Sequence, residues 1–137
     1  MKILIAPDKF KDSLTALEVC KALASCIKRI DPAIETVSQP MADGGEGTLE
    51  VLNTNLNLEK SEVIVNDPLF RPIEAYYLKN KNTAFIEMAE ASGLQRLETD
   101  EYNPAKTSTF GTGELIKHAI ESGVKQINLF VGGQRYQ

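Results

Sequence analysis

Residues 43–48 read Asp-Gly-Gly-Glu-Gly-Thr and combine two carboxylates with three glycines. Glycine adopts positive φ easily and lets the backbone approach a ligand closely. Successive N–H groups in such a turn form a nest for an anion, which the positive end of a short helix over residues 48–52 would reinforce. On spacing alone, a glycine-rich hairpin with solvated acids is an equal alternative. The predicted substrate- or phosphate-binding residues here are Gly44, Gly45, Gly47 and Thr48.

The two acids of this segment, Asp43 and Glu46, would repel an anion unless a cation intervenes or one of them acts as a base. A carboxylate beside a phosphate suits Mg²⁺ binding or deprotonation of a substrate hydroxyl. Both acids are therefore candidate catalytic residues. Glu87 and Glu90 form a second pair of acids, and their spacing is compatible with either a catalytic or a solvated position.

Asp8, Lys9 and Lys11 follow a short apolar run over residues 2–6 that is typical of a buried strand. Open α/β sheets bind ligands just beyond the carboxyl ends of their strands. Lysine ammonium groups at that position would neutralise phosphate oxygens in a transition state, which makes all three residues catalytic candidates. Taken alone, a loop with two lysines is more often a solvated surface.

A second cluster of glycines and hydroxyls, Thr-Ser-Thr-Phe-Gly-Thr-Gly over residues 107–113, precedes a helix expected over residues 114–120. This cluster would also hold an anion at a helix N-terminus. Ser and Thr serve equally well as ordinary helix N-caps, so both interpretations stay open. The predicted binding residues are Thr107, Ser108, Gly111, Thr112 and Gly113.

The elements that position the first cluster are predicted from apolar periodicity. Strands are expected over residues 2–6 and 34–38, with a helix between them whose apolar stripe covers residues 17–30. Thr15 and Glu18 have the spacing of a capping box at the start of this helix. A strand, a helix and a second strand in this order predict a βαβ unit.

The pattern changes after this unit. Strand-like runs over residues 63–65, 73–78 and 84–86, separated by turns, predict an antiparallel meander, and a final strand is expected over residues 126–131. We therefore expect an α/β fold with a Rossmann-like βαβ start plus an antiparallel strand meander. The expected organisation is a single unit over 1–137 with a sub-boundary near 53–62, the βαβ lobe preceding it and the meander, 63–87, following it.

Composition excludes several classes of protein. A length of 137 residues suits one domain, and the net charge of −4 argues against a general nucleic-acid or membrane-surface binder. No apolar run reaches the ~20 residues that span a bilayer, and the first apolar stretch is too short for a signal peptide, so a cytoplasmic location is expected. Two cysteines and one histidine do not supply a zinc site, and neither a Walker A motif nor G-x-G-x-x-G occurs.

Five stretches, in order across nearly the whole chain, resemble the N-terminal part of the bacterial glycerate kinases of the type I family. The match is specific because it combines five separate motifs. The first begins Ala-Pro-Asp-Lys-Phe-Lys-Asp-Ser-Leu, and the second contains Met-Ala-Asp-Gly-Gly-Glu-Gly-Thr. The stretches are residues 6–14, 40–48, 67–72, 87–94 and 103–115.

This resemblance implies a two-lobed α/β architecture with a cleft between the lobes. It implies transfer of the γ-phosphoryl group of ATP to glycerate with Mg²⁺, giving phosphoglycerate by phosphorylation of the 2- or the 3-hydroxyl. Asp8, Lys9 and Lys11 would face the cleft, as would residues 43–48 and the loop over residues 107–113. The expected partners are glycerate and a nucleotide, with no nucleic acid and no membrane.

Phosphoryl transfer needs mainly positioning, a metal and cations at the developing charge, with little covalent work by the protein. We therefore assign Lys9 and Lys11 to charge stabilisation. Asp43 or Glu46 would interact with the substrate hydroxyl or with a metal-bound water.

The resemblance ends at the last residues. Family members continue after Gly-Gly with Ser-Ala-Thr-Asn-Asp-Gly-Gly and a long remainder, whereas this chain reads Gln-Arg-Tyr-Gln over residues 134–137. Those four residues can be encoded as cag-cgc-tac-caa, which a shift of one base turns into codons for Ser-Ala-Thr and the start of Asn. We therefore expect a chain that is truncated or frameshifted after Gly133 and that has little or no kinase activity by itself.

Two other functions stay open at this stage. The first is a non-catalytic small α/β module that binds a small anion, or a partner through an exposed sheet edge. The second is a nucleotide-dependent oxidoreductase, which the missing dinucleotide fingerprint disfavours.

Overall fold

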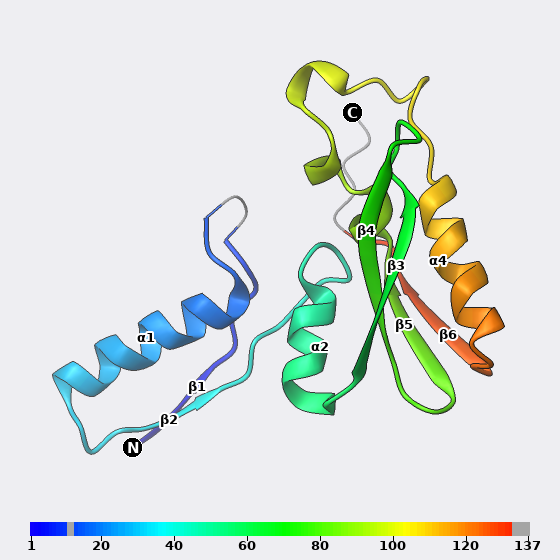
Figure 1. The fold of residues 1–137 in the computed structure, drawn as a ribbon. Coiled ribbons are helices and arrows are strands. Elements are labelled where there is room, and N and C mark those ends of the chain that lie inside the picture. Colours follow the sequence, from blue (N-terminus) through cyan, green and yellow to red (C-terminus); the bar gives the residue numbers. More distant parts are fainter. Residues whose placement is uncertain (11–12, 133–137) are drawn as a thin grey trace. The chain divides into compact units, whose positions relative to one another are not determined.

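The computed structural model describes residues 1–10 and 13–132. Predictions that fall on Lys11 or on the tail from Gly133 to Gln137 therefore lie outside the described residues and stay predictions. The chain has a mixed α/β fold and forms two compact units, Met1–Asp43 and Gly44–Gln137 (Figure 1). The division falls earlier in the chain than residues 53–62.

The first unit is the predicted βαβ element. It consists of β1 (Lys2–Ile5), α1 (Ala16–Ile30) and β2 (Glu35–Ser38), and β1 pairs with β2 in parallel. The capping box forms as predicted at the start of α1, because the backbone N–H of Glu18 donates to Thr15 Oγ1 at 3.2 Å and that of Thr15 donates to Glu18 Oε2 at 2.8 Å. The sequence pattern thus predicts this unit correctly.

The expectation that the first strand is buried is wrong for one of its faces. Ile5 is buried, as are Val19 and Cys20 of α1, and Cys20 Sγ lies 3.7 Å from the carbonyl oxygen of Ile5. Leu4 points to the opposite face and is 65% exposed. An apolar run predicts burial on both faces only where a second layer covers the sheet.

The second unit contains a four-stranded sheet in the order β3-β4-β5-β6. Strands β3 (Glu59–Asn66), β4 (Pro72–Lys79) and β5 (Thr83–Glu87) form the predicted antiparallel meander. Strand β6 (Gln126–Phe130) pairs with β5 in parallel, so the sheet is mixed.

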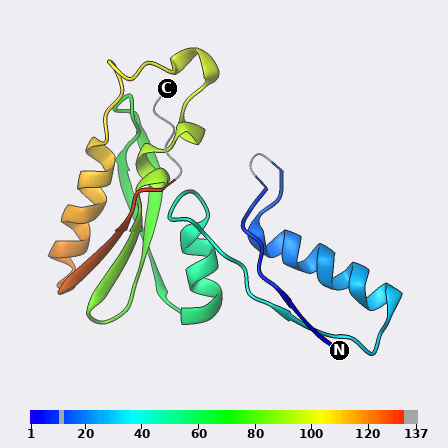
Figure 2. The ribbon, with the colours of Figure 1, turned by 180° about the vertical axis from the view of Figure 1, so that it is seen from behind.

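Helices cover the two faces of this sheet. Helix α4 (Phe110–Glu121) packs through Leu115 and Ala119 against buried side chains of β3, β4 and β5, among them Tyr77. Helix α2 (Thr48–Leu56) lies on the other face, as the two opposite views show (Figures 1 and 2). A short helix α3 (Met88–Ser92) and two 3₁₀ turns, Leu94–Arg96 and Thr99–Glu101, follow β5.

Two helix boundaries differ from the predictions. Helix α2 continues to Leu56, beyond the expected end at residue 52. Helix α4 begins at Phe110, so the glycines predicted to precede it lie in its first turn. Gly111 is required there by packing, because a Cβ at this position would lie 1.8 Å from the carbonyl oxygen of Asn66.

Across residues 1–10 and 13–132, no helix is long and apolar enough to cross a bilayer. Cys20 is a buried free thiol and Cys26 an exposed one.

Candidate functional site

The carboxyl ends of three strands meet at one edge of the second unit's sheet. Strands β3 and β5 are both antiparallel to β4, so they run in the same direction as each other and as β6. Their last residues are Asn66, Glu87 and Phe130. This is the edge at which open α/β sheets bind ligands.

Both predicted glycine clusters lie at this edge. The backbone N–H of Gly47, just before α2, donates to Glu87 Oε1 at 3.2 Å. The backbone N–H of Asn66 donates at 2.7 Å to Glu114 Oε2, in the first half of α4. The N-termini of α2 and α4 are therefore held beside the ends of β5 and β3.

The first cluster forms a tight turn, as predicted from its glycines. Gly44 and Gly47 have φ of 93° and 89°, values that favour glycine. The N–H of Gly132, just after β6, donates to the carbonyl oxygen of Gly44 at 3.0 Å. Thr48 is 4% exposed, and its hydroxyl donates to the carbonyl oxygen of Gly45 at 2.6 Å.

The amide groups at the start of α2 bind a carboxylate of the chain itself. Glu87 is 1% exposed, and its two carboxylate oxygens accept hydrogen bonds from the N–H groups of Gly47 and Leu49, the latter at 3.1 Å. These two amides therefore already have an internal acceptor, and phosphate binding by residues 44–48 stays a prediction. The sequence does not indicate this role for Glu87, because its partner Gly47 is 40 residues away.

Burial dominates the protonation of Glu87. Desolvation raises its pKa to about 7, and the negative charge of Glu90 acts in the same direction. Hydrogen bonds from the backbone N–H groups of residues 47–49 favour the charged form, but they offset only part of this effect. Glu87 therefore changes charge near neutral pH.

Further acids surround Glu87. Burial raises the pKa of Glu90, while Arg96, 3.3 Å away, and Lys60 lower it and Glu46 raises it. The pKa of Tyr76 rises to about 12 because of burial and nearby carboxylates that include Glu90 and Glu87. The local field is negative, so a phosphate would bind here only together with a cation.

The second cluster also has internal partners. Thr112 is 5% exposed, and its hydroxyl lies 2.7 Å from Ser92 Oγ. Ser108 Oγ accepts the N–H of Phe110 at 3.1 Å at the start of α4. Thr107 is half-buried and Gly113 is exposed. Ligand binding by this cluster stays a prediction.

In the first unit, the structure brings two predicted segments together. The N–H of Met41 donates to the carbonyl oxygen of Pro7 at 2.9 Å. The loop that carries Asp8 and Lys9, at the end of β1, therefore lies beside the segment that leads to Asp43. Asp8 and Asp43 are exposed, and Asp8 Oδ1 accepts the N–H of Lys9 at 2.6 Å.

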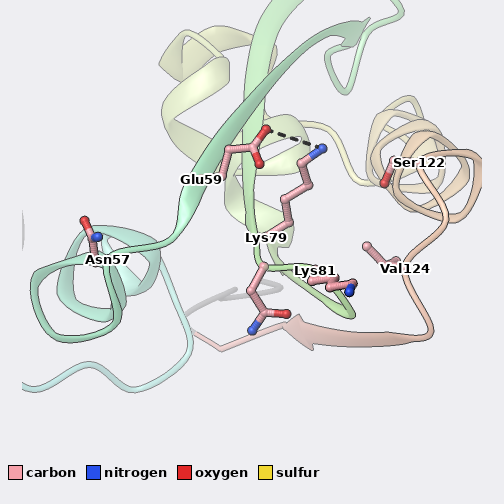
Figure 3. Close-up of a pocket in the computed structure, with 7 residues that line it drawn as sticks. Asn57, Glu59, Lys79, Lys81, Ser122 and Val124 are labelled. Atoms are coloured by element: carbon pink, nitrogen blue, oxygen red, sulfur yellow. Dashed lines mark ion pairs between the residues drawn. The ribbon is translucent and has the colours of Figure 1, made fainter.

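A pocket of about 370 Å³ lies at the opposite edge of the second unit's sheet (Figure 3). It contains none of the predicted site residues. The pocket is lined by side chains of both charges, and the ammonium group of Lys79 pairs with the carboxylate of Glu59 at 3.6 Å. The lining residues are Asn57, Glu59, Lys79, Asn80, Lys81, Ser122 and Val124.

Magnesium binding by carboxylates of this chain stays a prediction. Within the described residues, no group of three or more His, Cys, Asp or Glu side chains could hold a metal ion. Mg²⁺ commonly takes only one or two carboxylates, with substrate phosphates and waters as its other ligands. Asp43 and Glu46, the acids of the first cluster, are both exposed.

Comparison with known proteins gives consistent matches. The model of the glycerate kinase family matches residues 3–135. The chain is 45% identical over 135 residues to a glycerate kinase of Bacillus cereus and 42% identical over 135 residues to the glycerate 2-kinase of Escherichia coli K12. In both cases the match covers 97% of this chain and 35% of the relative.

A solved structure shows the same fold. The crystal structure of a proposed glycerate kinase 2 from Salmonella typhimurium LT2 superposes with a TM-score of 0.75 at 43% identity. It matches 98% of this chain, which corresponds to 36% of that chain. The chain thus spans about a third of the length of these relatives.

Proposed function

This chain belongs to the glycerate kinase family, and we propose that it supplies part of the site that transfers the γ-phosphoryl group of ATP to a hydroxyl of glycerate. The observation that carries the proposal is the family match over residues 3–135. Because the chain spans only 35% of the length of its relatives, we propose the complete reaction for proteins that contain this region. We expect the chain by itself to have little or no activity.

In the first unit, we propose that Lys9 and Lys11 stabilise the charge that develops on the phosphoryl group. Asp43 would orient the glycerate hydroxyl or accept its proton. The hydrogen bond between Met41 and Pro7 supports this pairing, because it brings the strand-end loop next to the segment before Asp43. Positioning and electrostatic stabilisation are what phosphoryl transfer requires of a protein.

In the second unit, we propose that the exposed members of the two clusters contact ligand and that the buried members hold them in place. Glu46 and Gly113 are exposed, and Thr107 is half-buried. Thr48 and Thr112 are buried and bonded internally, so they fix the backbone of their segments. When bound, Mg²⁺ would neutralise phosphate charge, with Asp43 or Glu46 as its protein ligand.

Ligand titration of this chain followed by NMR tests the proposal. Adding a non-hydrolysable ATP analogue with Mg²⁺, and then D-glycerate, should move the amide signals of residues 8–9 and 43–48. The matched control is the pocket at the opposite edge, where the amides of Asn80 and Lys81 should not move. Shifts confined to that pocket would contradict the proposal.

A coupled ATP-hydrolysis assay with D-glycerate tests the expectation for the chain alone. We expect a rate close to that of the sample without protein. A turnover comparable to that of a full-length member of the family would show that residues 1–137 contain a complete site, which would overturn this expectation.

A further inference from the structure

We propose that Glu87 is a positioning residue: its carboxylate fixes the glycine turn over residues 44–47 and thereby sets where Glu46 is presented. The role of Glu46 as a ligand-contacting group rests on the proposed function, whereas the action of Glu87 on the turn does not. Glu87 ends β5, is 1% exposed and bonds the amides of Gly47 and Leu49.

The turn is held at both of its ends. At the Gly47 end the partner is Glu87, and at the Gly44 end it is the N–H of Gly132. Between them, the carbonyl oxygen of Gly45 accepts the N–H of Thr48 at 3.2 Å and the hydroxyl of Thr48 at 2.6 Å. Glu46 is thus the exposed residue of this turn, and hydrogen bonds hold the backbone of the glycines on both sides of it.

A carboxylate is the side chain that suits this position. The two N–H donors, at residues 47 and 49, each bond a different oxygen of Glu87. A glutamine offers one oxygen as an acceptor, and its NH₂ group would face the second N–H. An alanine would leave the buried N–H of Leu49 and the half-buried N–H of Gly47 without this acceptor, which is costly.

The charged groups around Glu87 come from several elements. Glu90 on α3 raises the pKa of Glu87, and the charge of Glu87 raises the pKa of Tyr76 on β4. Arg96 and Lys60 act on Glu90 and lower its pKa. Glu90 therefore has cationic neighbours of its own. It is a partly buried acid whose ion-pair partner is Arg96, and it serves as the matched control for Glu87.

NMR measurements on the whole chain test the inference without any ligand. In the wild type, the amide signals of Gly47 and Leu49 should titrate together, with a common midpoint near the pKa of Glu87 of about 7. In Glu87→Gln this common titration should disappear, and it should persist in Glu90→Gln.

Hydrogen exchange separates positioning from general stability. In Glu87→Gln, the amides of residues 45–47 should exchange at least about tenfold faster, which corresponds to the loss of a charge-assisted hydrogen bond. Amides in β4 should keep their rates. Equal acceleration everywhere would show a purely structural role and overturn the proposal, as would unchanged exchange in the turn.

The wild-type titration keeps the inference falsifiable even where Glu87→Gln does not fold. Independent or absent titration of Gly47 and Leu49 in the wild type would overturn it. Unmoved amide signals at residues 8–9 and 43–48 after addition of the ATP analogue and glycerate would instead count against ligand contact by this chain, and would leave the role of Glu87 in the turn intact.

Discussion

The backbone of Gly111 lies against the carbonyl oxygen of Asn66 so closely that a Cβ at residue 111 would be 1.8 Å from that oxygen. This contact joins the first turn of α4 to the end of β3. We expect Gly111→Ala to lower the free energy of unfolding by about 2–4 kcal/mol, because a backbone carbonyl cannot move aside easily. Urea unfolding followed by tyrosine fluorescence measures this, since all four tyrosines belong to the second unit.

Gly113 provides the matched control in the same turn of α4. A Cβ at this position meets nothing within 4 Å among the described residues. We expect Gly113→Ala to stabilise the protein by about 0.5–1 kcal/mol, because alanine favours the helix more than glycine does. If both variants lost the same free energy of unfolding, the steric contact between residue 111 and Asn66 would not explain the loss, and a need for backbone freedom at both glycines would explain it instead.

The raised pKa of Glu87 predicts a stability that depends on pH. Its pKa of about 7 in the folded protein lies above the ordinary glutamate value of 4.5, so the folded state binds the proton more tightly. The resulting stabilisation is complete below pH ~4.5 and is lost as the pH rises to ~7, by on the order of 3 kcal/mol. Glu87→Gln should remove this decline in chemical unfolding measured across that range.

Glu90→Gln is the comparison for this pH effect. Burial also raises the pKa of Glu90, so Glu90 also contributes to the decline in stability with rising pH. Glu90→Gln should therefore remove a part of this decline. The larger part should remain as long as Glu87 is present. If the stability of the wild type changed between pH 4.5 and 7 in the same way as that of Glu87→Gln, with no additional decline, Glu87 would not be the source of the pH effect.

Local patterns predicted most of the fold. The capping box of Thr15 and Glu18, the apolar stripe of α1 and the three strand-like runs each depend on residues close in sequence, and each is found in the structure. The glycine turn was predicted for the same reason, since positive φ at Gly44 and Gly47 is a local property.

Contacts between distant residues could not be predicted in this way. The need for glycine at residue 111 comes from Asn66 on another element, and the anion at the start of α2 comes from Glu87. A buried acid directly after the apolar strand residues 84–86 was the available signal. It became interpretable only when the structure showed which amides it meets.

Replacement of Asp67 is a second change that we expect to destabilise the protein. It is 2% exposed and accepts the N–H groups of Leu69 at 2.8 Å and Arg71 at 2.9 Å, as well as the Arg71 side chain. Burial alone would raise the pKa of Asp67, but these hydrogen bonds outweigh it and lower the pKa. Asp67→Ala should cost about 2–4 kcal/mol in the free energy of unfolding, because it leaves the turn's donors without their acceptor.

The other carboxylate partner of Arg71 serves as the control for Asp67. Glu101 bonds the guanidinium of Arg71 at 2.7 Å from a more exposed position. Glu101→Ala should therefore destabilise the protein much less in the same urea experiment. A loss equal to that of Asp67→Ala would indicate that the ion pair of Arg71, rather than the backbone bonds to Asp67, stabilises this turn.

The proposed role of Asp43 predicts a loss of catalysis without a loss of fold. In a full-length member of the family, replacing the aspartate that matches Asp43 by asparagine removes a proton acceptor but keeps the shape of the side chain. We expect phosphoryl transfer to glycerate to fall by roughly 10²–10⁴, the range typical of general-base catalysis, with an unchanged thermal unfolding curve. The coupled ATP assay measures the rate, and turnover close to that of the wild type would remove Asp43 from the reacting groups and leave Glu46 as the remaining acid of the segment.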